Sequence, residues 1–157
     1  MFVVYLLCEN SDLPEKIREM PHGMFFKTVA SPSELPQGKR GVVIVHNLPQ
    51  GAVGLIPAGY VGVAQEGDAV AMRLFKESGI QAVTCGFSPT ATVTLTSVGD
   101  DCAAVGIQRS MLSLNGAPVE EGEFSVKFRE GYDQFVAMAW ATAALLALGP
   151  NKFPAFV

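Results

Sequence analysis

Residues 131–149, GYDQFVAMAWATAALLALG, decide the fold of this protein. The segment predicts a helix over 133–148 that ends at Gly149-Pro150, where the glycine and proline stop a helix. Nearly every position is apolar, so no polar face is left for solvent. A helix that is hydrophobic all round is buried on more than one side. We therefore expect a layered domain that packs around this helix.

The first half of the chain alternates strands and helices. Runs of apolar residues predict strands that are covered on both faces, and a weaker strand precedes a proline-rich loop. Two helices begin at aspartates, Asp12 and Asp68, which favour the N-terminal cap of a helix. This alternation indicates a three-layer α/β sheet with flanking helices. The expected strands are 2–8, 25–30, 41–47 and 60–64, and the expected helices are 12–20 and 68–78.

After Gly79 the apolar residues recur at every second position. Strands are expected at 80–85, 92–96, 103–108 and 123–128, and Asn115-Gly116 predicts a hairpin turn. These strands predict a small antiparallel meander before the last helix. We expect a single domain over 1–157, with an N-terminal α/β portion (1–59), a second portion (60–149) and a tail (150–157).

The composition excludes several classes of function. The 157 residues carry a net charge of −4, and the isoelectric point is about 5.1, so no nucleic-acid-binding footprint is expected. No apolar run reaches the about 18 to 20 residues that a membrane span requires. The N-terminus lacks the basic flank of a signal peptide, and Cys8, Cys85 and Cys102 are expected to be buried free thiols in a cytoplasmic protein.

Several short motifs occur in a set order in the second portion. Val61-Gly62-Val63-Ala64-Gln65-Glu66-Gly67-Asp68 leads from a strand into a helix, and Thr84-Cys85-Gly86 follows. Gly131, Gln134 and Ala137 open the last helix, which ends in Ala147-Leu148-Gly149. Over 60–149 this order resembles the C-terminal part of the central domain of the Mur ligases, the ATP-dependent amino-acid ligases of peptidoglycan precursor synthesis. The resemblance implies that family's central-domain fold.

The chain departs from the Mur ligase pattern at the residues that bind ATP. Gly38-Lys39-Arg40 lacks the hydroxyl residue and the glycine-rich loop that a P-loop requires. Gln65 and Gly67 replace an asparagine and an aspartate of the family, while Gln134 and Ala137 replace two asparagines. The C-terminal ligase domain is also missing from this sequence. The resemblance therefore implies a scaffold with a residual ligand cleft, without the ligase reaction and without bound ATP or magnesium.

Four polar residues lie at or just beyond the carboxyl ends of two predicted parallel strands. In open α/β sheets, ligands bind outside the carboxyl ends of the strands. His46, Asn47, Gln65 and Asp68 are therefore expected to line one crevice. The alternative is structural: His46 bonds to loop backbone, and Asp68 caps its helix.

Three further residues are candidates for ligand binding. Ser88 lies in a hydroxyl-rich turn that either binds an anion or only connects two strands. Arg109 either clamps a phosphate or carboxylate or pairs with one of Glu120, Glu121 and Glu123 across the hairpin. Gln134 occupies a family ligand position.

The sequence contains no complete catalytic set and no metal-ligand spacing. A Cys85 nucleophile with His46 as its base lacks support from any neighbouring motif. We therefore expect a non-catalytic module that binds a small ligand or a protein partner, with a link to cell-wall precursor metabolism through the resemblance alone. The alternatives are a nucleotide-binding partial ligase completed by a partner subunit, and a homo-oligomeric assembly module that uses the apolar tail.

Overall fold

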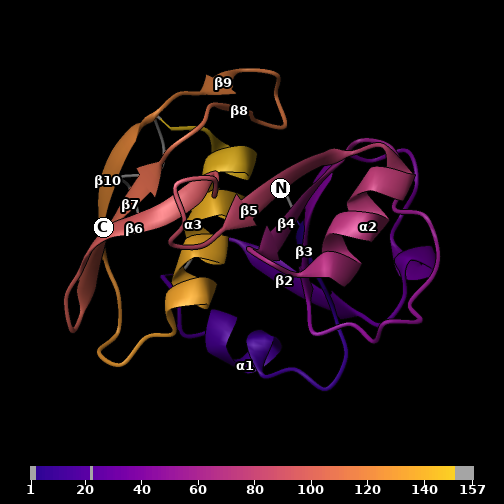
Figure 1. Ribbon diagram of the computed structural model, residues 1–157, viewed down its shortest axis with the longest axis horizontal. Coiled ribbons are helices and arrows are strands. Elements are labelled where there is room, and N and C mark those ends of the chain that lie inside the picture. Colours follow the sequence, from indigo (N-terminus) through magenta and orange to yellow (C-terminus); the bar gives the residue numbers. More distant parts are fainter. Residues whose placement is uncertain (1–2, 22, 151–157) are drawn as a thin grey trace.

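One sheet of eight strands organises the protein in the computed structural model, which describes residues 3–21 and 23–150 (Figure 1). The strand order is β10-β7-β6-β5-β4-β3-β1-β2, and pairing is parallel from β2 to β6 and antiparallel from β6 to β10. The bounds are β1 Val3–Cys8, β2 Phe25–Val29, β3 Gly41–His46, β4 Tyr60–Gln65, β5 Gln81–Cys85, β6 Val93–Val98, β7 Cys102–Ile107 and β10 Gly122–Lys127.

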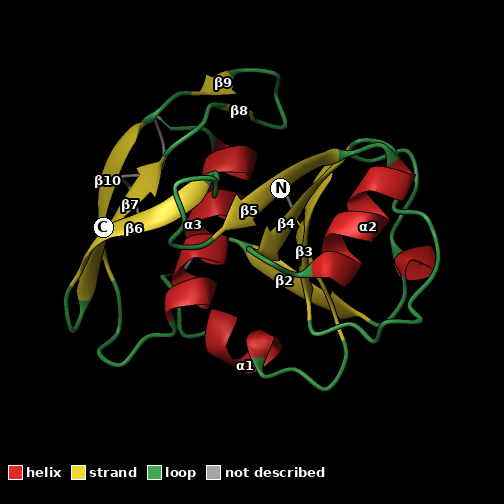
Figure 2. Cartoon of the chain, in the orientation of Figure 1, coloured by secondary structure: helices red, strands yellow, loops and turns green. Residues whose placement is uncertain are grey.

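Helices cover both faces of the sheet, so the predicted three-layer α/β architecture is confirmed (Figure 2). The short helix α1 (Leu13–Ile17) and the long helix α3 (Gln134–Leu148) lie on one face, and α2 (Ala69–Ser78) lies on the other. A 3-10 turn, η1 (Pro32–Glu34), follows β2. The sheet has a hydrophobic core on each face, and alternate residues of β1 enter one core or the other, with Leu6 on the α3 side and Leu7 on the α2 side. A strand that is apolar at every position is thus covered on both faces.

Helix α3 is enclosed on all sides, as its sequence predicts. Every residue from Phe135 to Ala147 is buried, and the rings of Trp140 and Phe128 pack edge to face with their centroids 5.9 Å apart. The central strands lie on one side of α3, and β6, β7 and β10 curve around the other side (Figure 1). This enclosure explains why α3 has no polar stripe.

The antiparallel strands are placed differently from the prediction. Strands β6, β7 and β10 continue the main sheet, because β6 pairs in parallel with β5 at Cys85 and Val93 before the chain turns back. A separate two-stranded sheet is formed by β8 (Met111–Leu112) and β9 (Pro118–Val119), and the predicted Asn115-Gly116 turn joins them. The 1–59 and 60–149 portions also share the sheet, since β3 pairs directly with β4.

The two expected helix caps behave differently. Asp68 accepts a hydrogen bond from the Ala71 backbone N–H at 3.0 Å, and Gly79 ends α2 in the left-handed conformation, as predicted. Asp12 precedes α1 without capping it, because its carboxylate is paired with Lys16 instead.

Two further predictions concern a membrane span and the C-terminal tail. Within the described ranges, no helix is long and apolar enough to cross a bilayer. The expected contact of the apolar tail falls on residues 151–157, which lie outside the described residues.

Candidate functional site

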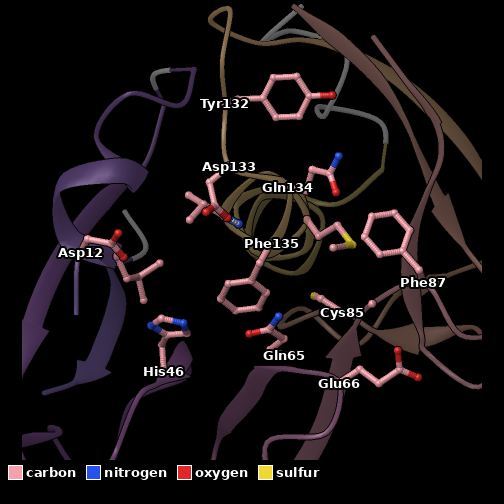
Figure 3. Close-up of a pocket in the computed structure, with 14 residues that line it drawn as sticks. Asp12, His46, Gln65, Glu66, Cys85, Phe87, Tyr132, Asp133, Gln134 and Phe135 are labelled. Carbon is pink, nitrogen blue, oxygen red and sulfur yellow. Dashed lines mark hydrogen bonds between the residues drawn. The ribbon is translucent and has the colours of Figure 1, made fainter. Parts of the chain in front are cut away.

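A pocket of about 640 Å³ opens at the carboxyl edge of the parallel strands. Five elements supply its walls: Leu13 from α1, His46 from the end of β3, Gln65 from β4, Cys85 from β5 and Phe135 from the first turn of α3. Figure 3 looks onto the start of α3, with Phe135 extending from the helix toward His46 and Gln65. We call this the main pocket. It lies where the geometry of parallel sheets places ligand sites.

The four residues singled out after the strands come together in the structure. His46, Asn47, Gln65 and Asp68 line a neighbouring hollow of about 320 Å³, which we call the side pocket. His46, Gln65 and Glu66 line both pockets, so the two open beside each other along one edge. The crevice is thus present, and it continues beneath the start of α3.

His46 is held on two sides. Its Nδ1 atom lies 2.7 Å from Ser11 Oγ, and its ring stacks on Phe135 with centroids 5.3 Å apart and planes inclined by 19°. The Ser11 side chain in turn accepts the Leu13 backbone N–H. The expected bond to loop backbone is replaced by this side-chain bond. His46 therefore forms an anchored part of the wall.

Asn47 has a structural role. Its Nδ2 donates to the carbonyl oxygens of Glu9 and Asn10, at 3.0 and 3.1 Å. Asn47 and Asn10 both adopt positive φ angles, a conformation that asparagine tolerates better than most residues. These bonds tie the end of β3 to the end of β1.

Two glutamines present free amides to the pocket from opposite sides. Gln65 ends β4 and Gln134 begins α3, and both are exposed. Among residues 3–21 and 23–150, neither amide side chain has a hydrogen-bond partner. Gln134 also lines a third hollow of about 300 Å³, the outer pocket, near Asp100 and Glu130. The glutamines are therefore able to donate to or accept from a ligand.

An ion-paired triad borders the main pocket, and sequence reasoning missed it. Lys16 Nζ lies 2.8 Å from Asp12 Oδ2 and 3.1 Å from Asp133 Oδ2. The hydrogen bond from Lys16 lowers the pKa of Asp12, and the bonds to Asp12 and Asp133 raise the pKa of Lys16. Asp133 also caps α3 by accepting the Val136 N–H at 3.0 Å. The bond between Lys16 and Asp133 therefore ties α1 to the start of α3, across 117 positions of the chain.

The turn that contains Ser88 already holds a carboxylate from its own chain. Glu66 accepts the Ser88 backbone N–H at 3.2 Å and the Thr90 hydroxyl at 3.4 Å. Hydrogen bonds from Ser88, and then from Thr90, lower the pKa of Glu66 against an opposing effect of burial. Gly86 makes room for this carboxylate, because an added Cβ would lie 2.6 Å from Glu66 Cβ. Ser88 lines none of the three pockets.

Arg109 lies apart from the site. Its side chain is exposed and lines none of the three pockets. The expected ion pair with Glu120, Glu121 or Glu123 is absent among the described residues, where all three glutamates are exposed. Gln108, its neighbour, instead turns back to donate to the carbonyl oxygens of Ser88 and Ala91.

The cysteines in the described part of the chain are free thiols, but only two are buried. Cys8 and Cys85 are buried and Cys102 is exposed, which corrects the prediction for Cys102, because β7 turns it toward solvent at the sheet rim. Burial raises the pKa of Cys85 to about 12, and Thr142 Oγ1 lies 3.6 Å from its sulfur. A thiol with that pKa carries almost no thiolate at neutral pH. Across residues 3–21 and 23–150, no group of three His, Cys, Asp or Glu is arranged to hold a metal ion.

Comparison with known proteins leaves this geometry as the basis for assigning a function. No protein-family model matches the chain, and a search of curated protein sequences also finds no match.

Proposed function

We propose that this protein is a non-catalytic binding module that takes a small molecule into the main pocket. The observation that carries the proposal is the convergence of polar, apolar and aromatic groups from five elements on one hollow of about 640 Å³. That volume lies within the usual range of small-molecule sites, which is about 300 to 1,000 Å³. The free amides of Gln65 and Gln134 both line it, one from the end of β4 and the other from the start of α3 (Figure 3).

We further propose that the scaffold is that of a Mur ligase central domain. Its support is the element order over 60–149, in which β4, α2, β5, the antiparallel strands and the buried α3 follow one another as the resemblance implies. The proposed link to cell-wall precursor metabolism depends on this resemblance alone.

The segment after β1 supports a binding role over nucleotide chemistry. A phosphate-binding loop at this place needs glycines, a lysine and a hydroxyl residue. Here the segment is Glu9-Asn10-Ser11-Asp12, which brings two carboxylates and no glycine or lysine. The Ser11 hydroxyl is engaged with His46 at 2.7 Å. A phosphate at this point would face like charges.

A thermal-shift screen with a blocked variant tests the proposal. The ligand set contains ATP, UDP-sugars and magnesium together with non-phosphorylated amines, amides and acids. A true ligand at 100 times its dissociation constant stabilises the fold by about 2.7 kcal/mol, which raises Tm by roughly 5 to 10 °C for a chain of this size. Gln134→Trp fills the mouth of the pocket from an exposed position, and Glu77→Trp places the same side chain on the exposed surface of α2 as a control.

We expect at least one non-phosphorylated compound to stabilise the native protein and Glu77→Trp but not Gln134→Trp. Stabilisation that survives in Gln134→Trp would place the ligand elsewhere and end the proposal for this pocket. Stabilisation by ATP and magnesium with turnover would favour the partial-ligase alternative instead.

A further inference from the structure

The pockets at the carboxyl edge share one sign of charge. The main, side and outer pockets are connected through shared residues, with His46 and Gln65 common to the first two, and Gln134 common to the first and third. The charged residues that line them are Asp12, Glu66, Asp68, Asp100, Glu130 and Asp133. In the described chain, no lysine or arginine lines any of the three. Low-dielectric walls with a single sign of charge concentrate ligands of the opposite sign.

The sites where an anion would normally bind are already filled by the protein's own carboxylates. The free N–H groups at a helix N-terminus attract anions. At α2 the Asp68 carboxylate takes the Ala71 N–H, and at α3 the Asp133 carboxylate takes the Val136 N–H. The Ser88 turn donates to Glu66 in the same way. Each anion-binding feature near the pocket is thus neutralised from within.

The ammonium group of Lys16 already binds two of the carboxylates at the edge of the main pocket. Its ammonium nitrogen contacts one carboxylate oxygen of Asp12 and one of Asp133, at 2.8 and 3.1 Å. A single ammonium between these two carboxylates, with Glu66 on the far side of the pocket, leaves the lining net negative. A second cation is therefore electrostatically favoured at this edge.

Aromatic rings line the same hollow. Phe135 stacks on His46, and the side chain of Phe87, which is 57% exposed, stands on the opposite rim (Figure 3). A cation above an aromatic face gains about 0.5 to 1 kcal/mol at an exposed site and more when water is excluded. The oxygens of Gln65 and Gln134 supply additional acceptors for N–H donors.

From these observations we propose that the main pocket binds a small organic cation, an amine, amidine or guanidine carried on a flat or short apolar body. The inference rests on the proposed binding function and adds the chemical class of the ligand. The cationic group lies toward Asp12, and the apolar body lies against Phe135.

Three probes of nearly identical shape test the charge requirement. Benzamidine is a cation, benzamide is neutral and benzoate is an anion. Binding is followed by two-dimensional NMR through the backbone amides that line the pocket. Asp12→Asn removes one rim charge without removing a helix cap, because the Asp12 side chain makes no cap bond. Glu121→Gln removes a charge from an exposed position that lines none of the three pockets and serves as the matched control.

We expect benzamidine to bind at least threefold more tightly than benzamide, and benzoate to bind more weakly than both. Asp12→Asn should weaken benzamidine binding by about three- to tenfold, the range that Coulomb's law gives for one charge about 6 Å away in a water-exposed site with an effective dielectric constant of about 40 to 80. Benzamide binding should not change in Asp12→Asn, and Glu121→Gln should bind all probes like the native protein.

Equal affinity for benzamidine and benzoate, an unchanged benzamidine affinity in Asp12→Asn, or no shift with any probe at 50 mM would each overturn the cation proposal. Failure here is distinguishable from failure of the binding function. A neutral or anionic compound that stabilises the native protein but not Gln134→Trp would keep the pocket as a binding site and reject only the cation.

Discussion

Substituting Gly62 with alanine tests the close approach of α2 to the sheet. Gly62 lies in the middle of β4, and the buried Phe75 of α2 covers it. An alanine Cβ at this position would lie 2.6 Å from Phe75 Cδ1 and 2.7 Å from its Cζ, whereas ordinary contacts are 3.4 to 4 Å. The Phe75 side chain is 1% exposed, so the ring has no open space into which to turn.

The expected loss of stability follows from this overlap. Restoring contact requires the ring to move by roughly 1 Å, and overpacking of this kind costs about 1 to 3 kcal/mol of unfolding free energy. For a chain of this size, that loss lowers Tm by roughly 2 to 12 °C. Chemical denaturation of native and Gly62→Ala protein measures the free energy directly. Gly122→Ala is the matched control, because Gly122 is also a strand glycine but has nothing within 4 Å of an added Cβ.

A double-mutant cycle identifies the Phe75 ring as the cause. Phe75→Leu removes the ring edge that the new Cβ meets, so the double variant should be more stable than the sum of the two single losses predicts. Residues in contact couple by about 0.5 to 3 kcal/mol. Losses that add to within 0.3 kcal/mol, or a Gly122→Ala loss as large as that of Gly62→Ala, would refute the steric argument.

Three further outcomes are expected. Hydrogen bonds from Ser88 hold the pKa of Glu66 below its ordinary 4.5, so Glu66 stabilises its turn at neutral pH, and this stabilisation is lost as pH falls through the lowered pKa. The NMR shifts of the backbone amides in the turn should therefore titrate below pH 4.5, and Glu66→Gln should abolish this transition. A thiol reagent at pH 8 should rapidly label the exposed Cys102 in the native protein. Cys85 should stay unlabelled until the protein unfolds, because it is buried and the pKa of its thiol is about 12. Rapid labelling of the Cys102→Ser variant would contradict this prediction. Asp68→Ala should lower the unfolding free energy by about 1 kcal/mol through loss of the α2 cap, while Asp68→Asn should retain most of it; equal losses in denaturant would argue against capping.

Local sequence patterns were sufficient for most individual elements. Helix α2 begins after Asp68 and ends before Gly79, as predicted, because capping depends on a few neighbouring residues. The apolar runs became strands buried on both faces, and Asn115-Gly116 became the β8–β9 turn. The crevice residues His46, Asn47, Gln65 and Asp68 were also predictable together, since neighbouring parallel strands end at the same edge.

Long-range contacts could not be read in the same way. The alternation of apolar residues in β6, β7 and β10 indicates which face is buried but not which strand is the neighbour, so the continuation of the main sheet was missed. Asp12 was predicted to cap its helix, yet the nearby Lys16 draws its carboxylate into the triad with Asp133. The Ser88 turn was predicted either to bind an anion or only to connect two strands, and it binds the carboxylate of Glu66 from its own chain.

The sequence by itself determined that residues 133–148 form a helix that must be buried all round, because no face of it is polar. Only the tertiary structure decided what encloses this helix and what its first turn faces. Its first turn lies over the strand ends, where Phe135 stacks on His46 and Asp133 meets Lys16. The physical reason is that burial depends on the chemistry of each residue, whereas a pocket depends on which distant residues the packing brings together.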